Sequence, residues 1–242
     1  MATQGRLAVL IDADNAEAGV IQELLAEVSR YGTATIKRAY GDWTTTNLRG
    51  WKDVLHKMAI QPIQQFRYTT GKNATDSALI IDAMDVLHGK SVDGFCIVSS
   101  DSDFTRLATR LRESGLTAYG FGARHTPEPF VAACDKFIYT EILKPEPVEI
   151  DDGVGPAITK IQPLLIAAID ANARDDGWAG LASVGGTVGK NQPDFDPRNY
   201  GFKKLSDLVK SLNYVEVKDI PSVRPDGTTI LNVQVRLKRV AR

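Results

Sequence analysis

Short apolar runs alternate with helical segments over about the first 140 residues, and this alternation restricts the possible folds more than any other feature of the chain. Residues 7–11 and 95–98 are continuously apolar, as expected for central parallel strands that are covered on both faces. Apolar residues at helical spacing follow each of these runs. Strands that alternate with helices of this length predict βαβ units, and therefore an α/β fold with a parallel sheet.

The expected elements cover the first 142 residues. We expect strands at residues 7–11, 33–39, 63–66, 95–98, 117–121 and 137–142, and helices at residues 20–28, 48–58, 76–87, 103–112 and 127–134. The next stretch, residues 144–156, has the proline-rich and acidic composition of a linker.

The last part of the chain has a different pattern. Helical segments are expected at residues 158–171, 179–189 and 202–212, and strands at residues 214–217 and 230–237, with a Pro-Asp-Gly turn between the strands. Three short helices followed by a β-hairpin form a winged helix. We therefore predict an α/β domain at residues 1–143, a linker at 144–156 and a winged-helix domain at 157–242.

Carboxylates stand where two of the central strands should end. Asp12 ends the first strand and Asp101 the fourth, while Asp76 opens a helix that could reach the same edge of the sheet. Several carboxylates in close proximity raise one another's pKa values, and a bound Mg²⁺ or Mn²⁺ removes this conflict because hard cations prefer oxygen ligands. The spacing therefore predicts a metal site, with Asn15 as a neutral ligand or substrate contact.

The alternative for each aspartate is a helix cap, a position that Asp fills well. Asp103 fits either a cap or an outer metal ligand. Ser99 and Ser100 could orient the carboxylates or a substrate phosphate, or could make ordinary hydrogen bonds at the end of the strand.

Residues 10–15, 72–82 and 98–104, in this order, resemble the NYN family of PIN-like nucleases. The resemblance covers roughly residues 5–142. It implies a metal-dependent ribonuclease in which acidic residues hold Mg²⁺ or Mn²⁺ and water attacks a phosphodiester. Position by position, the family's acidic motif falls on Asp12, Asn15, Asp76 and Asp101, with Asp103 as a further acidic position.

The second domain resembles a LOTUS (OST-HTH) domain, especially over residues 199–209, Asn-Tyr-Gly-Phe-Lys-Lys-Leu-Ser-Asp-Leu-Val. The resemblance implies a winged-helix module linked to RNA binding. Such modules are often found beside NYN domains, and the combination is similar to the LabA-like NYN proteins of bacteria. RNA is therefore the expected partner.

A nuclease also needs phosphate contacts near its metal. In the α/β domain we expect them from Arg38, Lys72 and Arg124, and in the winged-helix domain from Lys203 and Lys204, although ordinary surface solvation explains each of these residues individually. Two aromatic residues, Tyr40 and Trp43, could stack on bases.

Composition sets broader limits. The net charge of −1 and the pI of about 6.3 argue against a globally basic nucleic-acid binder, although residues 153–242 carry 13 basic against 9 acidic side chains. Cys96 and Cys134 lie in apolar segments and are expected to be buried free thiols. The chain shows no signal peptide and no apolar run that could cross a bilayer, so we expect a cytoplasmic protein with no membrane partner.

Two other functions compete with the ribonuclease. Asp12-Ala13-Asp14 is similar to the start of aspartyl phosphatase motifs, in which the first aspartate is a covalent nucleophile, but Ala16 stands where those families have a hydroxyl residue. The other alternative is a non-catalytic RNA-binding adaptor, against which the intact set of carboxylates argues.

Overall fold

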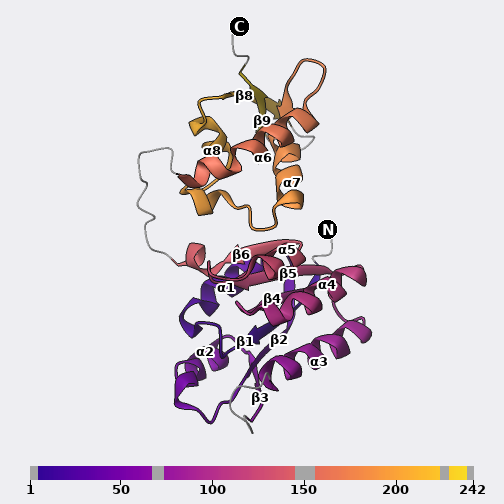
Figure 1. Ribbon diagram of the computed structural model, residues 1–242, viewed down its shortest axis with the longest axis vertical. Coiled ribbons are helices and arrows are strands. Elements are labelled where there is room, and N and C mark those ends of the chain that lie inside the picture. Colours follow the sequence, from indigo (N-terminus) through magenta and orange to yellow (C-terminus); the bar gives the residue numbers. More distant parts are fainter. Residues whose placement is uncertain (1–4, 67–73, 145–155, 224–228, 239–242) are drawn as a thin grey trace. The chain divides into compact units, whose positions relative to one another are not determined.

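The computed structural model of the chain describes residues 5–66, 74–144, 156–223 and 229–238. The chain divides into two compact units, Met1–Pro145 and Glu146–Arg242 (Figure 1). Each unit has a hydrophobic core of its own. Most of the predicted linker, residues 144–156, lies outside the described residues.

The first unit contains a six-stranded sheet in which every pair of neighbouring strands is parallel, which confirms the predicted α/β class. The strand order is β3-β2-β1-β4-β5-β6. The bounds are β1 (Arg6–Asp12), β2 (Thr33–Gly41), β3 (Gln61–Gln64), β4 (Gly94–Val98), β5 (Thr117–Gly122) and β6 (Lys136–Tyr139).

Helices cover both faces of this sheet. The bounds are α1 (Ile21–Val28), α2 (Trp51–Lys57), α3 (Ala74–His88), α4 (Thr105–Glu113) and α5 (Glu128–Ala133), with short 3-10 turns η1 (Ala18–Val20), η2 (Thr46–Leu48), η3 (Ser102–Phe104) and η4 (Thr140–Leu143). One core contains α1 and α2, and the other contains α3, α4 and α5. Alternate residues of β1 serve the two cores, because successive side chains of a strand point to opposite faces.

In this unit, the bounds of β3, α2 and β6 differ from the expected ones for reasons that the structure shows. β3 begins at Gln61 rather than at residue 63, since it pairs in register with Arg38 of β2. The helix expected at residues 48–58 is a 3-10 turn followed by the short α2. β6 ends at Tyr139, and the chain then turns through η4 so that Ile142 and Leu143 pack against the core on the α1 side.

The strand order reverses between β1 and β4. The chain proceeds outward from β1 to β2 and β3, and α3 then carries it back to β4 on the other side of β1. Ile11 pairs with Val98, so the residues that follow these two strands emerge side by side at the carboxyl edge. In an open α/β sheet this reversal is where ligands bind.

The second unit is the predicted winged helix. Its elements are α6 (Pro156–Asn172), β7 (Ala179–Gly180), α7 (Leu181–Asn191), η5 (Pro197–Tyr200), α8 (Leu205–Ser211), β8 (Val215–Val223) and β9 (Thr229–Leu237). The strands form an antiparallel sheet in the order β7-β9-β8, and the helices and this sheet share one core. The third helix begins at Leu205 rather than at residue 202, so Lys203 and Lys204 precede it.

Cys96 and Cys134 are both buried and free, as expected. Among the described residues, no helix combines the length and the apolar character that a bilayer-spanning segment needs.

Candidate metal centre

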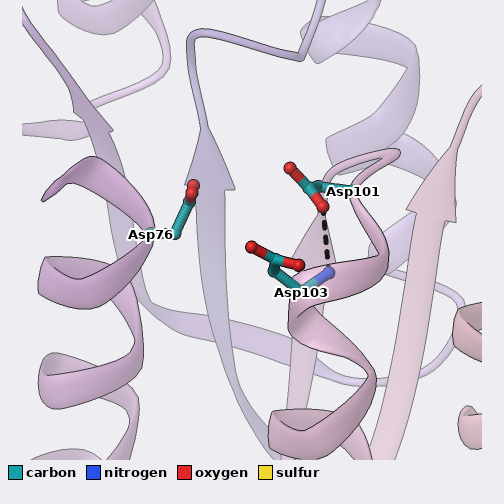
Figure 2. A group of neighbouring side chains, drawn as sticks. All are labelled: Asp76, Asp101 and Asp103. Atoms are coloured by element: carbon teal, nitrogen blue, oxygen red, sulfur yellow. Dashed lines mark hydrogen bonds between the residues drawn. The ribbon is translucent and has the colours of Figure 1, made fainter. Parts of the chain in front are cut away.

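Three carboxylates converge at the carboxyl edge of the sheet. Asp76, Asp101 and Asp103 each offer one oxygen, and these three oxygens all lie within 4.8 Å of one another. Figure 2 shows Asp76 extending from the start of α3 toward the other two, which follow the end of β4. Such a set of oxygen ligands matches the preference of Mg²⁺ or Mn²⁺.

Asp101 and Asp103 are held together by the local backbone. Oδ1 of Asp101 accepts a hydrogen bond of 2.9 Å from the amide of Asp103, which makes Asp101 the N-cap of η3 (Figure 2). The Asp101 amide in turn donates to the hydroxyl of Ser99 over 3.1 Å. Asp101 therefore caps a helical turn and joins the acidic cluster, so the two alternatives for it are compatible.

Asp12 lies beside this cluster and is fully buried at the end of β1. Its Oδ2 accepts hydrogen bonds from Asn15 Nδ2 at 2.7 Å and from Ser99 Oγ at 2.8 Å. Its Oδ1 is buried and has no hydrogen-bond partner among the residues that the structure describes. Burial raises the pKa of the Asp12 carboxyl, and the hydrogen bonds from Asn15 and Ser99 oppose that rise.

The electrostatics of Asp76 link all these groups. Burial, followed by the charges of Asp12, Asp101 and Asp103, raises the pKa of Asp76 to about 6. A bound divalent cation would reverse this effect, since it favours ionised carboxylates. The unpaired oxygen of Asp12, the raised pKa of Asp76 and the all-oxygen donor set therefore fit such an ion.

One supporting contact had not been expected from the sequence. Thr75, in the first turn of α3, donates a hydrogen bond of 3.1 Å from its hydroxyl to Oδ2 of Asp14. This bond joins the loop after β1 to the start of the helix that carries Asp76. The one signal in the sequence that could have indicated a role for Asp14 was its position two residues after Asp12, at the end of the same strand.

Two of the predicted basic residues, Arg38 and Arg124, contact side chains outside the three-carboxylate cluster. Arg38 forms an ion pair of 2.9 Å with Asp82 of α3, and the hydroxyl of Tyr40 donates to the same carboxylate over 2.8 Å. Arg124 follows β5, and its guanidinium lies 5.7 Å from the centre of the Tyr139 ring.

Lys72 lies outside the described residues. Lys203 and Lys204 are exposed in the second unit, where Lys204 is the N-cap residue of α8.

The fold and this site define a class of protein. In this class, a doubly wound α/β domain carries an acidic centre where its strand order reverses, and a winged-helix domain follows the α/β domain in the chain. Comparison with family models finds an NYN domain at residues 6–143 and an OST-HTH/LOTUS domain at residues 157–225. The chain therefore belongs to the NYN domain family, with the PIN-like fold and the LOTUS domain that the sequence motifs predict.

Three solved structures illustrate what the chain is similar to. A Vibrio parahaemolyticus protein of unknown function is 17% identical, with a TM-score of 0.48 over 57% of this chain and 93% of that one. An uncharacterized protein from Nitrosomonas europaea is 32% identical, with a TM-score of 0.31 over 41% of this chain and 90% of that one. A Chromobacterium violaceum protein fragment is 34% identical, with a TM-score of 0.27 over 40% and 92%. No curated protein matches the chain.

Proposed function

We propose that this protein is a ribonuclease that depends on Mg²⁺ or Mn²⁺, hydrolyses phosphodiester bonds within RNA and uses its winged-helix domain to bind RNA. The convergence of the Asp76, Asp101 and Asp103 carboxylates at the sheet edge is the observation that carries the proposal. The NYN and OST-HTH/LOTUS family matches support it.

Each residue of the centre has a role in this proposal. Asp76, Asp101 and Asp103 hold the ion, and the unpaired Oδ1 of Asp12 contacts it directly or through a water. Asn15 and Ser99 fix the Asp12 carboxylate by hydrogen bonds to its other oxygen. When bound, the ion lowers the pKa of a coordinated water and offsets the charge that develops on the phosphate.

The RNA contacts come from both domains. Arg124 is exposed after β5, and Lys203 and Lys204 are exposed just before α8, so solvent and RNA phosphates can reach all three side chains. Lys72, in the segment before α3, is proposed as a further contact. The ion pair of Arg38 with Asp82 favours a structural role for Arg38, which ties β2 to α3.

The test is a cleavage assay on end-labelled RNA and on DNA of the same sequence, with Mg²⁺, with Mn²⁺ and with EDTA. We expect the wild type to cut RNA only with metal, and Asp76→Asn to lose most of the activity because its neutral amide no longer attracts the ion. Asp85→Asn is the matched control, since Asp85 lies on the same helix but is exposed and away from the cluster.

Three results would overturn the proposal. Cleavage by Asp76→Asn at the rate of Asp85→Asn would remove the role of the acidic centre. RNA binding confined to residues 157–242, with no cleavage under any metal, would favour an adaptor. A covalent phosphate on Asp12 would favour the phosphatase chemistry.

A further inference from the structure

A large hollow lies beside α2, and the proposed metal centre makes no use of it. Its volume is about 980 Å³, at the upper end of the range for sites that bind small molecules. The hollow combines an apolar wall with a basic rim. The wall includes Trp43, Leu48 and Pro62, and the rim includes Arg49, Lys52 and His56.

The wall is built around a fixed aromatic ring. Trp43 is half-buried, and its indole N–H donates to the carbonyl of Ile63 in β3 over 3.0 Å. Its ring meets Trp51 edge to face, with centroids 6.3 Å apart and planes inclined by 75°. Because both the polar atom and the edge of the ring are held, the ring is in place before any ligand arrives, which lowers the entropy cost of binding.

Arg49 and Lys52 give the rim its positive charge, and His56 lies beside them. Arg49 precedes α2, and Lys52 and His56 lie on α2, three and seven residues after Arg49. This spacing places the three side chains on the same side of the helix, facing the hollow. None of the three makes an ion pair or a side-chain hydrogen bond with any part of the chain that the structure describes. No acidic side chain is among the described residues that line the hollow, so its charge is complementary to an anion.

The wall of the hollow adjoins the acidic centre through Gly41 at the end of β2. A methyl group on Gly41 would lie 2.6 Å from Leu48 Cδ1, in the wall, and 3.9 Å from Oδ1 of Asp14. Asp14 is hydrogen-bonded to Thr75, the neighbour of Asp76. Gly41 therefore separates the wall of the hollow from the loop that carries Asp14, on the side of the acidic centre.

We propose that the hollow receives one unpaired base of the RNA substrate, which packs against Trp43 while Arg49 and Lys52 contact the phosphates on either side of it. The proposal rests on the proposed ribonuclease function and defines its substrate class as single-stranded RNA. A base in a duplex cannot enter, because its faces are stacked and its edges are paired. An aromatic wall accepts any base, since every base has a π face.

The first test measures RNA binding by the full chain in EDTA, where metal-dependent cleavage is absent. Arg49→Ala combined with Lys52→Ala removes two phosphate contacts, and both side chains are exposed, so the fold is kept. The slope of log K against log salt should fall in magnitude by about 1.4, which corresponds to two contacts with a single strand. The control is Lys90→Ala, which should leave the slope unchanged. Lys90 is exposed and lies between α3 and β4, at the amino edge of the sheet and away from the carboxyl edge.

The second test locates the base directly. RNA that contains 4-thiouridine is crosslinked by light to the wild type, and the protein is then digested with trypsin. We expect the crosslink in the peptide of residues 39–49, which contains Trp43, for the single strand and not for the same sequence in a duplex. Crosslinks found only in other peptides, or equal salt slopes for the double variant and Lys90→Ala, would overturn the inference.

The outcomes separate this inference from the proposed function. If the wild type and the Arg49/Lys52 double variant cut and bind RNA equally well, the hollow is no base site and the ribonuclease stands. If the crosslink maps to Trp43 but no metal supports cleavage, the base site stands and the ribonuclease assignment fails.

Discussion

The hydroxyl of Ser99 joins the two strand ends that carry the acidic centre. It donates to the Asp12 carboxylate at the end of β1 and accepts from the Asp101 amide after β4. With 2% of its surface exposed, Ser99 is held in this geometry by the core and by a backbone bond from its own amide to Phe121 of β5. One small side chain thereby sets the positions of two carboxylates.

Ser99→Ala should weaken metal binding and RNA cleavage by about 10- to 100-fold, as is usual when a group that orients a metal ligand is removed. Metal affinity is measured by calorimetry with Mn²⁺, and cleavage by the rate on labelled RNA. Ser100→Ala is the control, because Ser100 accepts only from the Ala123 amide among its described bonds and should have a smaller effect. Equal losses in the two variants would contradict the role of Ser99.

The raised pKa of Asp76 predicts how stability depends on pH without metal. The folded value of about 6 lies above the ordinary 3.8, so the folded state keeps a proton between about pH 4 and pH 6 that the unfolded chain has lost. The stability that this proton contributes is complete below the unfolded pKa and is lost as the pH rises through about 6. In EDTA, Asp76→Asn should therefore match the wild type near pH 4 and exceed its stability above about pH 6.

The difference should be on the order of 1 kcal/mol, because Asp76 is only half-buried and solvent screens its repulsion. Urea unfolding of both proteins across this pH range measures it, with Asp85→Asn as the control. A difference between Asp76→Asn and wild type that stays constant with pH would contradict the prediction. Adding Mg²⁺ near neutral pH should stabilise the wild type more than the variant.

The sequence predicts which carboxylates gather but not their detailed arrangement. Asp12 and Asp101 could be placed because each directly follows an apolar strand, and parallel strands end at one edge. The contact of Asp14 with Thr75 depends on where α3 begins, which no local pattern defines. Tyr40 was predicted as a candidate for base stacking, but it is fully buried and bonded to Asp82, so only Trp43 remains available for that role.

At the level of elements, a polar link fixes α3 to β2. Tyr40 and Arg38 of β2 both donate to the Asp82 carboxylate of α3, six residues after Asp76. Burial and the hydrogen bond with Asp82 raise the pKa of the Tyr40 hydroxyl, so this hydroxyl remains a donor. The link therefore helps to hold the helix that presents Asp76.

Asp82→Ala should destabilise the α/β unit by about 1–3 kcal/mol, because the buried hydroxyl of Tyr40 loses its acceptor. Tyr40→Phe should cost about 1 kcal/mol, since Asp82 keeps Arg38. Urea unfolding of the two single variants and the double variant gives their coupling energy. Additive effects, or an Asp82→Ala protein as stable as Asp85→Ala, would show that the link contributes nothing.

The bounds of buried strands could be predicted from the sequence, whereas the bounds of strands that depend on pairing with a neighbour could not. The central strand β4 is apolar throughout, and β1 is apolar between Arg6 and Asp12, so both runs are visible in the sequence. β3 is an edge strand of exposed and half-buried residues that includes Pro62, and its bounds follow from pairing with β2 rather than from any pattern. The same reason explains why β6 ends early.

At the level of the whole molecule, each unit has its own core, and no core cluster of the described residues contains side chains from both. We expect residues 1–145 and 156–242 to fold when they are produced separately, as circular dichroism and thermal melting would show. Residues 1–145 alone should still cleave RNA with metal, but with weaker binding, because the linked second domain raises the effective concentration of the RNA.

Mixing the two pieces should not restore the affinity of the intact chain, since the advantage depends on the covalent connection. A failure of residues 1–145 to fold alone would contradict this independence. Full recovery of affinity on mixing would show instead that the units associate without the linker.

The order of two domains could be predicted because the sequence pattern changes from βαβ repeats to three helices and a hairpin near residue 150. The basic hollow beside α2 could not be predicted from the sequence. Its lining comes from η2, α2 and β3, and a helix face that is half apolar and half basic is typical of an ordinary surface helix. Only the packed structure shows that Trp43 and Pro62 enclose that face.

The bond between Ser99 and Asp12 also affects how the protein is made, because it spans 87 positions of the chain. At roughly 5–20 residues per second, synthesis of that interval takes on the order of 4–17 seconds. During this time the end of β1 has no β4 beside it, and pairing over so long a loop is slow. The acidic centre is therefore assembled only after β4 has left the ribosome, so the growing chain carries no complete centre during synthesis of this interval.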